Sequence, residues 1–582
     1  MARRAAARTV GFGANPLLAV RLPAYRSRLL LGCIALAFAA LALRATYLQV
    51  FTDDYLREQG EARYARTLIL PPSRGKILDR NGTVLAASLP AQAVWAIPGQ
   101  TEATPEQLKR LGKLINVDPR EIRKKLEETE RNLVYLRRQL DPAVAEKVRE
   151  LQINGVHLQR EYKRHYPEGE TVAHIVGFTN VDDAGQEGIE LARNRLLAGQ
   201  AGSRRVIKDR LGRVIEDLRA VREPLNGADI TLSIDSRMQF LAFNALRDTV
   251  REHRAKAGAV VVLDVVTGEI LALANWPSYN PNQRANLSGA QLRNRAITDT
   301  FEPGSTLKPF TAALALELGI ATPRTVIETA PGRITVGSAT ISDVHSYGAL
   351  SLEQVIQKSS NVGVTKLALQ MKPQQVWEFY TALGLGQVPQ LAFPGAVAGR
   401  VRPHRSWRPI EQATMSFGHG LSGSLIQLAR AYLVFARDGE LLALSITRSD
   451  APAGGRQVIQ PRTAQAVRHM LEMAAGPGGT APLAQVAGYR VAGKTGTARK
   501  LENGQYVKKY IASFVGFAPV SAPRVVVAVM IDEPDAGKYY GGQVAAPLFS
   551  RITAESLRAM RVEPDAPGVP VVIPPTSVTE SM

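Results

Sequence analysis

The sequence predicts an α+β protein that is held at one end by a membrane-spanning helix. Two observations predict this class. Residues 29–51, LLLGCIALAFAALALRATYLQVF, are long and apolar enough to cross a bilayer, which takes about 20 residues at helical rise. Farther along, apolar strand patterns at residues 259–276 and 490–532 enclose about 200 residues of mainly helical pattern, as expected of a sheet with inserted helices.

The charges around the apolar run predict its orientation. The run holds one charge, Arg44, toward its end, where a long side chain can reach the membrane interface. Before the run there is no acidic residue but several arginines: Arg3, Arg4, Arg8, Arg21, Arg26 and Arg28. The positive-inside rule therefore predicts a cytoplasmic basic tail at residues 1–28, an anchor at 29–51 and export of the rest. A cleaved signal peptide is the alternative, but its candidate site at residues 40–42 lies inside the apolar run, which favours an uncleaved anchor.

The composition narrows the classes of partner. A net charge of +20 would suit a nucleic-acid-binding protein, but an exported domain is not expected to meet nucleic acid, so lipid headgroups and cell-wall polymer are the expected anionic partners. Cys33 is the only cysteine, and the eight histidines lack the spacing of metal ligands. The sequence therefore predicts no disulfide within the chain, no metal site and no cofactor.

The segment after the anchor has a mixed pattern. Residues 70–86 predict a hairpin around an Asn-Gly turn, and residues 104–151 show helical periodicity with dense charge, most simply a solvated helical face. Residues 161–190 predict an irregular folded module, and the polar stretch 221–229 predicts a linker. The predicted parts are thus a first module at 52–227, a second domain at 228–561 and a disordered proline-rich tail at 562–582.

The strand patterns of the second domain are distinct. Residues 259–276 predict two apolar strands around the turn at Thr267 and Gly268, and three more strands are predicted at 490–498, 510–519 and 524–532.

The stretch FEPGSTLKPF contains a serine and a lysine three residues apart, Ser305 and Lys308. Pro309 fits a helix only in its first turn, which predicts a helix start near Ser305 and puts Lys308 on the same face. A serine becomes a nucleophile when a neighbouring base takes its proton, and burial can prepare a lysine for that role. Taken alone, the pair fits a capping serine beside an exposed lysine better, and the same spacing recurs at Ser73 and Lys76, where a hairpin pattern would separate the side chains.

Two further motifs change this balance. Ser359 could relay a proton and Asn361 could hold a substrate amide, although the stretch also reads as a plain loop between two helices. A similar triplet, Ser278 to Asn280, lies in a turn before Ser305. In a strand pattern, Lys494, Thr495 and Thr497 could bind a carboxylate while Gly496 lets a substrate backbone approach; an ordinary edge strand is the alternative.

The three motifs in this order resemble the signature of penicillin-binding proteins and serine β-lactamases. Four longer stretches resemble class B penicillin-binding proteins: residues 293–310, KSSNVGV, VAGKTGTA and YYGGQVAAPLF. The first two are most similar to the division-specific septal transpeptidase, and Asn361 stands where the elongation enzyme usually has aspartate. SRGKILDRNGTVLA and residues 164–190 resemble the elongated non-catalytic pedestal of the same class. The resemblance covers residues 29–560.

The resemblance implies an antiparallel sheet flanked by helices and a D,D-transpeptidase that cross-links peptidoglycan. It implies that Ser305 attacks a stem peptide ending in D-Ala-D-Ala, with Lys308 as base, and that β-lactams acylate the same serine. Ser359 and Asn361 would assist proton transfer and orientation, and backbone N–H groups of Ser305 and Thr497 would form the oxyanion hole. The terminal carboxylate would be held by the side chains of Lys494, Thr495 and Thr497. A septal glycosyltransferase and other division proteins of the inner membrane are the implied partners.

Two rivals stay open at this point. One is a hydrolase, either a carboxypeptidase or a β-lactamase, although the chain has no E-x-x-L-N stretch after Asn361 for a deacylating water. The other is a non-enzymatic penicillin sensor or division scaffold. The basic residues of 104–151 suggest a surface for division partners.

Overall fold

The structure is a computed structural model, which describes residues 23–51, 65–128, 133–208, 214–449, 454–566 and 568. Most of the predicted basic tail and most of the predicted disordered tail lie outside these residues. The chain divides into two compact units, one formed by the chain up to Leu70 with Gly202–Glu223 and the other by Pro71–Ala201 with the chain from Pro224 onward.

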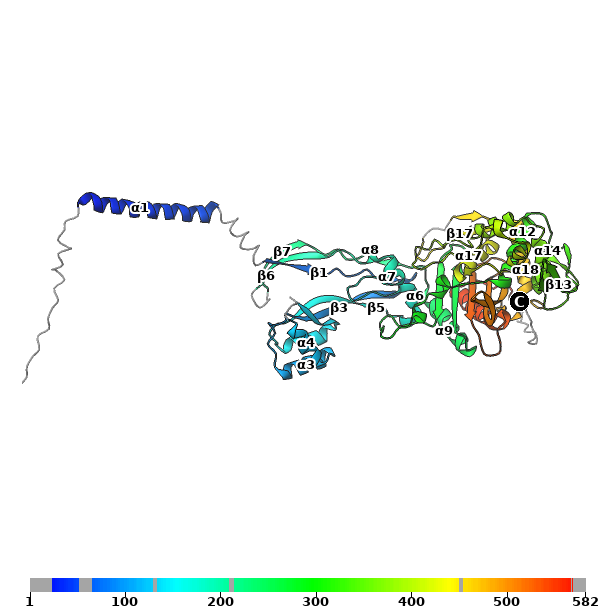
Figure 1. Ribbon diagram of the computed structural model, residues 1–582, viewed down its shortest axis with the longest axis horizontal. Helices are drawn as coiled ribbons and strands as arrows, with labels where there is room; N and C mark the ends of the chain where they lie inside the picture. The colour runs from blue at the N-terminus through cyan, green and yellow to red at the C-terminus, as the bar shows by residue number, and fades with distance from the viewer. Residues whose placement is uncertain are drawn as a thin grey trace, which may run out of the picture. The chain divides into compact units, whose positions relative to one another are not determined.

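The first unit contains the N-terminal helix and a small sheet. Helix α1 spans Ala24–Thr46 and continues as a π-helical turn at Tyr47–Phe51 (Figure 1). Residues Ala24–Gln49 are long and apolar enough to cross a membrane, and no residue of their most apolar window is buried. A helix at the predicted anchor is confirmed, although it begins before residue 29. The sheet has the order β1-β6-β7 and contains three antiparallel strands: β1 (Ala65–Leu70), β6 (Gly202–Lys208) and β7 (Val214–Arg222).

The second unit begins with the predicted hairpin. Strands β2 (Ile77–Leu78) and β3 (Val84–Ala96) pair antiparallel around Gly82, whose φ of 87° suits glycine. The hairpin is confirmed, but its first strand is shorter than predicted because residues 71–76 are irregular. The sheet is completed by three strands: β4 (Val134–Leu140), β5 (Val156–His165) and β8 (Ile230–Thr231). Strands β3 and β5 lie side by side (Figure 1).

The prediction of continuous helical structure over 104–151 is wrong in its middle. Three helices form there, α3 (Pro105–Ile115), α4 (Pro119–Glu127) and α5 (Pro142–Glu150), but β4 lies between the last two. Along β4, Val134 and Leu136 are buried while Tyr135 and Arg137 are exposed. This alternation, together with pairing to β3, outweighs the helical preference of the charged residues.

The predicted irregular module at 161–190 begins with the end of β5 and then contains short helices only. These are η3 (Gly169–Thr171), α6 (Ala173–Val176), α7 (Gly188–Ala192) and, just after it, α8 (Asn194–Leu197). Its centre is polar: the Glu190 carboxylate accepts hydrogen bonds of 2.6 Å from both Arg74 and Arg164, and all three side chains are buried. The first two residues of the predicted linker at 221–229 are the end of β7. Residues 223–229 therefore form the connection between β7 and β8.

The predicted strands of the second domain form one antiparallel sheet of five strands, in the order β10-β9-β21-β20-β19. Their bounds are β9 (Ala257–Asp264), β10 (Ile270–Trp276), β19 (Ala492–Glu502), β20 (Gln505–Ala518) and β21 (Val525–Asp532). All five predictions are confirmed. Strand β19 lies at one edge of this sheet and pairs with β20 alone among the described strands.

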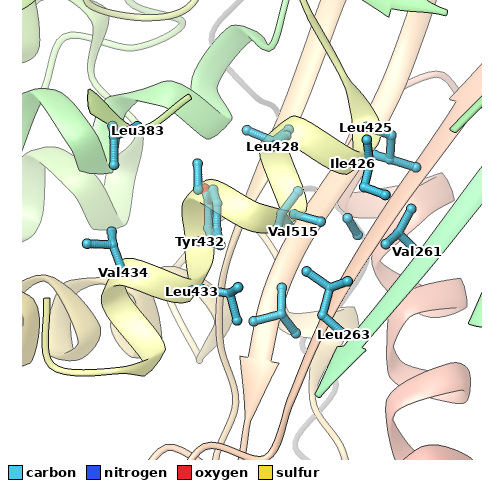
Figure 2. Packing of buried hydrophobic residues seen from close by; sticks show 14 of the residues in the cluster. Val261, Leu263, Leu383, Leu425, Ile426, Leu428, Tyr432, Leu433, Val434 and Val515 are labelled. Atoms are coloured by element: carbon cyan, nitrogen blue, oxygen red, sulfur yellow. The ribbon is translucent and has the colours of Figure 1, made fainter. Parts of the chain in front are cut away.

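Helices cover both faces of this sheet. Val261 and Leu263 of β9 pack with helix α17 (Leu425–Ala436), and Figure 2 shows their side chains near those of Ile426 and Leu433. The alternate residues Val260 and Val262 pack on the opposite face with α9 (Ser236–Glu252) and α19 (Gly541–Ala559). Successive strand residues point to opposite faces, so the apolar runs that predicted the strands are buried on both sides.

The remaining elements lie between β10 and β19 in the sequence. They are α10 (Gly289–Leu292), α11 (Arg295–Thr298), β11 (Thr300–Phe301), η4 (Gly304–Leu307), α12 (Lys308–Glu317), β12 (Val326–Glu328), β13 (Arg333–Val336), β14 (Ala339–Ser342), β15 (Ala349–Ser351), α13 (Leu352–Lys358), α14 (Asn361–Ala368), α15 (Pro373–Ala382), η5 (His404–Ser406), α16 (Pro409–Met415), β16 (Gly423–Ser424), β17 (Glu440–Leu442), β18 (Gly455–Gln457), α18 (Pro461–Ala475) and η6 (Pro482–Ala484).

The first residues of the predicted tail are held by hydrogen bonds. The Tyr489 hydroxyl donates to the Val562 carbonyl, and the Asp565 carboxylate accepts from the backbone of Arg490 and of Ser521. Residues 562–566 therefore belong to the folded domain, which moves the start of the predicted tail toward the C-terminus.

Candidate active site

Ser305 lies in a single 3₁₀ turn, η4, directly before α12. The α-helix proper begins at Lys308, with Pro309 in its first turn as predicted. In a 3₁₀ turn residues three apart lie above one another, so the Ser305 and Lys308 side chains share a face even more closely than on an α-helix. Ser305 is 7% exposed and Lys308 is fully buried, which excludes the alternative of an exposed lysine.

Lys308 joins the first motif to the second. Its amine donates a hydrogen bond of 2.5 Å to the Ser359 carbonyl oxygen and one of 3.0 Å to Ser359 Oγ. Ser359 ends helix α13 with φ 61° and ψ 41°, a left-handed conformation that is uncommon for a residue with a side chain. This backbone turn presents both Ser359 oxygens to the same amine.

A carboxylate that the sequence interpretation missed holds the next turn of the chain. Asp343 accepts hydrogen bonds from the backbone N–H of Asn361 and Val362 and from the Ser360 hydroxyl, at 2.5, 3.0 and 2.5 Å respectively. It thereby caps the N-terminus of α14, where the helix dipole favours negative charge. Asn361 is fixed further by its side-chain N–H, which donates to the Ser342 carbonyl at 3.0 Å.

The third motif lies on the edge strand β19. Lys494 is fully buried, and its amine lies 3.4 Å from Thr480 Oγ1 and 3.3 Å from Thr495 Oγ1. The two hydroxyls are 3.0 Å apart, so Thr480, which the sequence interpretation also missed, belongs to this cluster. A buried amine surrounded by hydroxyls is suited to bind an anion such as a carboxylate.

Gly496 and Thr497 connect the strand to its neighbours. A Cβ atom on Gly496 would lie 2.7 Å from the Pro303 carbonyl oxygen and 2.9 Å from a Thr306 methyl carbon. The sequence predicts that glycine here lets a substrate backbone approach; in the structure the missing side chain also lets the strand pack against the turn that carries Ser305. The Thr497 hydroxyl accepts a hydrogen bond of 3.0 Å from the Gly541 N–H at the start of α19.

A polar contact links the tip of the β19–β20 hairpin to the turn before Ser305. The Tyr506 hydroxyl lies 3.0 Å from each carboxylate oxygen of Glu302, which also accepts from the Gly420 N–H at 2.8 Å. Burial raises the pKa of Glu302, and these two donors oppose that effect. His419 packs edge-on against Tyr506, and burial, with a smaller effect of the Lys308 charge, lowers the pKa of its imidazole to about 4.

These elements border a hollow of about 350 Å³, a size suited to a small ligand group. Its lining residues come from β14, the start of α14, the end of α16 with the loop that follows it, and the β19–β20 hairpin: Thr340, Ile341, Ser342, Asn361, Thr414, Phe417, His419, Arg499 and Tyr506. Asn361 therefore places the second motif at the wall of this hollow.

The two stretches that repeat the spacing of a site motif, Ser73 to Lys76 and Ser278 to Asn280, have structural roles. Lys76 is exposed in the irregular segment before β2, and the Ser73 backbone N–H bonds the Asn226 side chain. The Ser278 hydroxyl donates to the Glu170 carbonyl at 2.8 Å. Neither has a buried lysine beside a serine hydroxyl, so their dismissal from the sequence is confirmed.

Comparison with known proteins agrees with this geometry. Residues 258–554 match the penicillin-binding protein transpeptidase domain, and residues 69–232 match the penicillin-binding protein dimerisation domain. The chain belongs to the penicillin-binding protein transpeptidase family. The sheet, apart from Ala257, and the Ser305 turn lie within the first matched range, and the hairpin β2–β3 lies within the second.

Relatives of this penicillin-binding protein match over nearly its whole length. It is 45% identical to the probable peptidoglycan D,D-transpeptidase PenA of Neisseria meningitidis serogroup A, covering 93% of this chain and 94% of the relative. It is 42% identical to the peptidoglycan D,D-transpeptidase FtsI of Escherichia coli K12, covering 93% of each chain. The apo transpeptidase domain of Burkholderia pseudomallei penicillin-binding protein 3 is 51% identical, with a TM-score of 0.54, and covers 58% of this chain and 98% of that structure.

Proposed function

We propose that this penicillin-binding protein is a serine D,D-transpeptidase that cross-links peptidoglycan stem peptides during septum formation and is a target of β-lactams. The observation that carries the proposal is the buried Lys308 amine, which lies three residues after Ser305 and binds both oxygens of Ser359. Relatives named as D,D-transpeptidases, which match over more than nine-tenths of their length, support the same reaction.

The first half-reaction makes an acyl-enzyme. Ser305 Oγ attacks the carbonyl carbon of the penultimate D-Ala, and Lys308 takes the serine proton. The C–N bond of the tetrahedral adduct then breaks, the leaving D-Ala nitrogen receives a proton through Ser359, and an ester joins the stem peptide to Ser305. Backbone N–H groups of Ser305 and Thr497 would stabilise the oxyanion, which is worth around 3 to 4 kcal/mol per donor in other acyl-transfer enzymes.

The second half-reaction transfers the acyl group. The amine of another stem peptide attacks the ester carbon, loses its proton to Lys308, and the Ser305–acyl bond breaks as Oγ takes a proton back. Asn361, which lines the hollow bordered by β14 and the β19–β20 hairpin, would orient the peptide amide. The hydroxyls of Thr495 and Thr497 and the amine of Lys494 would hold the terminal carboxylate of the donor, with Gly496 between them keeping the strand close to the Ser305 turn.

Labelling with a fluorescent penicillin tests the assignment of the nucleophile. We expect the label on the peptide that contains Ser305, and a Ser305→Ala protein that folds and localises normally but neither binds the label nor supports septal cross-linking. Cross-linking by the alanine variant would refute the assignment and leave the scaffold role. The lifetime of the penicilloyl-enzyme separates the transpeptidase from a hydrolase, because rapid turnover of the label would indicate a β-lactamase or carboxypeptidase.

The placement in the cell follows from α1. We propose that this helix is a single-pass anchor of the inner membrane, with the N-terminus in the cytoplasm and both matched domains in the periplasm at the division site, as the charge asymmetry of the sequence supports. A reporter enzyme that is active only after export, fused after residue 582, tests the orientation; a signal from a cytoplasm-specific reporter at that position would reverse it.

The proposed partners are a septal glycosyltransferase and other membrane proteins of division. Exposed basic side chains on α3 and α4, among them Lys109, Arg110, Arg123 and Lys124, form the candidate partner surface. Reversing these four charges should weaken co-purification with the division proteins and leave penicillin labelling intact. Unchanged co-purification would dismiss this surface.

A further inference from the structure

A second cavity lies away from the Ser305 site, among α15, α17 and the β17–β18 pair. Its volume is about 490 Å³, within the range of small-molecule sites. The walls are mixed: Trp377 and Leu391 are apolar, while Arg430, Arg456 and Glu378 bring charge. No residue given a role in the proposed reaction lines it.

The two arginines carry the inference. The Arg430 guanidinium donates from Nε to the Leu442 carbonyl at 2.8 Å, and Arg456 donates from Nη2 to the Ala382 carbonyl at 2.5 Å. Each guanidinium is thereby oriented by one backbone bond. Within the described ranges, no carboxylate oxygen lies within 4.0 Å of either guanidinium, in contrast to the arginines of the Glu190 cluster.

Two like charges that share a cavity repel each other when, as among the described residues here, no carboxylate forms an ion pair with either of them. Burial, with the neighbouring Arg456 charge as a second cause, lowers the pKa of Arg430. A bound anion would relieve this repulsion, and a planar guanidinium group can bind a carboxylate through two parallel N–H groups. The Gln427 amide does not compete for this role, because its N–H groups already donate to the carbonyls of Gly384, Gln387 and Ala398.

The backbone is shaped around one of these side chains. Gly384 has φ 90°, and a Cβ atom there would lie 2.8 Å from Arg430 Nη1. A side chain at this position would displace the guanidinium from the cavity wall.

The remaining lining favours a peptide over an inorganic anion. Glu378 is exposed on the same wall and would repel a multiply charged phosphate, but it complements an ammonium group. The Trp377 indole offers a flat apolar surface for alkyl or sugar groups. We propose that this cavity binds a short peptidoglycan peptide, with its carboxylate on Arg430 and Arg456 and its amine toward Glu378. The choice of peptidoglycan as source rests on the proposed function.

Binding of the tripeptide L-Ala-γ-D-Glu-L-Lys to the full chain in detergent tests the site. The tripeptide lacks D-Ala-D-Ala, and Ser305 is first blocked with penicillin, so the reaction site is occupied. Calorimetry should give saturable binding that weakens at least 10-fold in Arg456→Gln, whose side chain is exposed enough to be replaced without unfolding, and in Arg430→Gln. Arg462→Gln, an exposed arginine on α18 outside the cavity, is the matched control and should bind as the parent does.

Each outcome decides the proposal. Absence of binding to the blocked parent, or equal binding by Arg456→Gln, overturns it. Displacement of the tripeptide by inorganic phosphate at an equal concentration would show a general anion site and overturn the peptide assignment. The proposed function is judged separately: the Arg456→Gln protein should keep full penicillin labelling, and loss of labelling in the parent would count against the transpeptidase and not against this cavity.

Discussion

The amine of Lys308 donates hydrogen bonds to both oxygens of Ser359, to the carbonyl at 2.5 Å and to Oγ at 3.0 Å. This contact joins two segments that are 51 residues apart in the sequence. Because the Lys308 amine has two acceptors on one residue, its position depends on the left-handed backbone of Ser359 as well as on the Ser359 side chain.

Removing the Ser359 hydroxyl should separate these two contributions. In Ser359→Ala the carbonyl acceptor remains, so we expect a folded protein with a nearly unchanged Tm but a penicillin acylation rate lower by roughly 10²- to 10⁴-fold, the usual value of a proton-transfer group. Stopped-flow acylation measures the rate. Ser406→Ala, at an exposed position in η5, is the control and should react normally; an unaltered rate in Ser359→Ala would remove Ser359 from the proton path.

Asp343→Asn should weaken the start of α14. The amide keeps the shape of the side chain but loses the charge and part of the capacity to accept from Ser360, Asn361 and Val362. We expect a loss of about 1–2 kcal/mol in the free energy of unfolding, typical of a helix cap, and slower acylation because Asn361 shifts. Asp343 is a positioning residue, so the fall in rate should depend on which substrate is used, being larger for a peptide thioester than for penicillin. Equal effects on both would argue against positioning through Asn361.

The Glu302–Tyr506 contact should stabilise the hairpin tip of β19 and β20. A double-mutant cycle with Tyr506→Phe and Glu302→Gln isolates the pair, and we expect a coupling of about 1 kcal/mol, in the range of a partly exposed hydrogen bond to a charged group. Loss of the hydroxyl also removes a donor that lowers the Glu302 pKa, so Tyr506→Phe should raise the pH at which Glu302 ionises. Thermal unfolding of the four proteins between pH 5 and 8 measures both effects, and a coupling near zero would show that the contact has no stabilising role.

His174 should make the fold sensitive to acid. Its Nε2 donates to the Gln291 carbonyl at 2.7 Å, and burial lowers its pKa from 6.5 to about 4. Below pH 6.5 the unfolded chain binds a proton that the folded chain does not, so stability is lost as the pH falls from 6.5 toward 4, by up to about 3 kcal/mol. In His174→Gln the drop in Tm between pH 7.5 and 4.5 should be smaller than in the parent. The same drop in both proteins would exclude His174 as the cause.

Glu190→Gln should be strongly destabilising. The glutamate lies between the buried guanidinium groups of Arg74 and Arg164, and its neutral replacement removes the charged carboxylate that accepts a hydrogen bond from each of them. Breaking a buried ion pair in this way costs about 3–5 kcal/mol. Thermal unfolding measures the loss, and Glu555→Gln, which removes an exposed pair with Arg558, serves as the control with an expected change under about 0.5 kcal/mol. A loss as small as that of the control would mean that water or a local shift replaces the ion pair.

The sequence allowed the main fold to be predicted because the decisive signals are local. The apolar runs at 259–276 and 490–532 are strands buried on both faces, and the apolar run that begins at residue 29 is a helix. The stretch 104–151 shows the limit of such reasoning: β4 consists of charged and apolar residues that also suit a helix, and it becomes a strand because β3 offers it a partner.

Within the candidate active site, the sequence indicated Ser305, Lys308, Ser359, Asn361 and the Lys494–Thr497 strand through their short spacings. Nothing local pointed to Asp343, Thr480, Glu302 or Tyr506. Each of these residues contacts a segment that is distant in the sequence. Asp343 caps the N-terminus of α14, Thr480 lies beside the buried Lys494 amine, and Glu302 contacts Tyr506 near the tip of the β19–β20 hairpin. The space beside Gly496 shows the same limit, since only the fold reveals that Pro303 and Thr306 occupy it. The order of the chemical groups, the strands and the long apolar helix could be predicted from the sequence alone, because these depend on neighbours along the chain. The tertiary structure decided which groups meet, because burial and hydrogen bonding between distant segments depend on how the helices pack against the edge of the sheet.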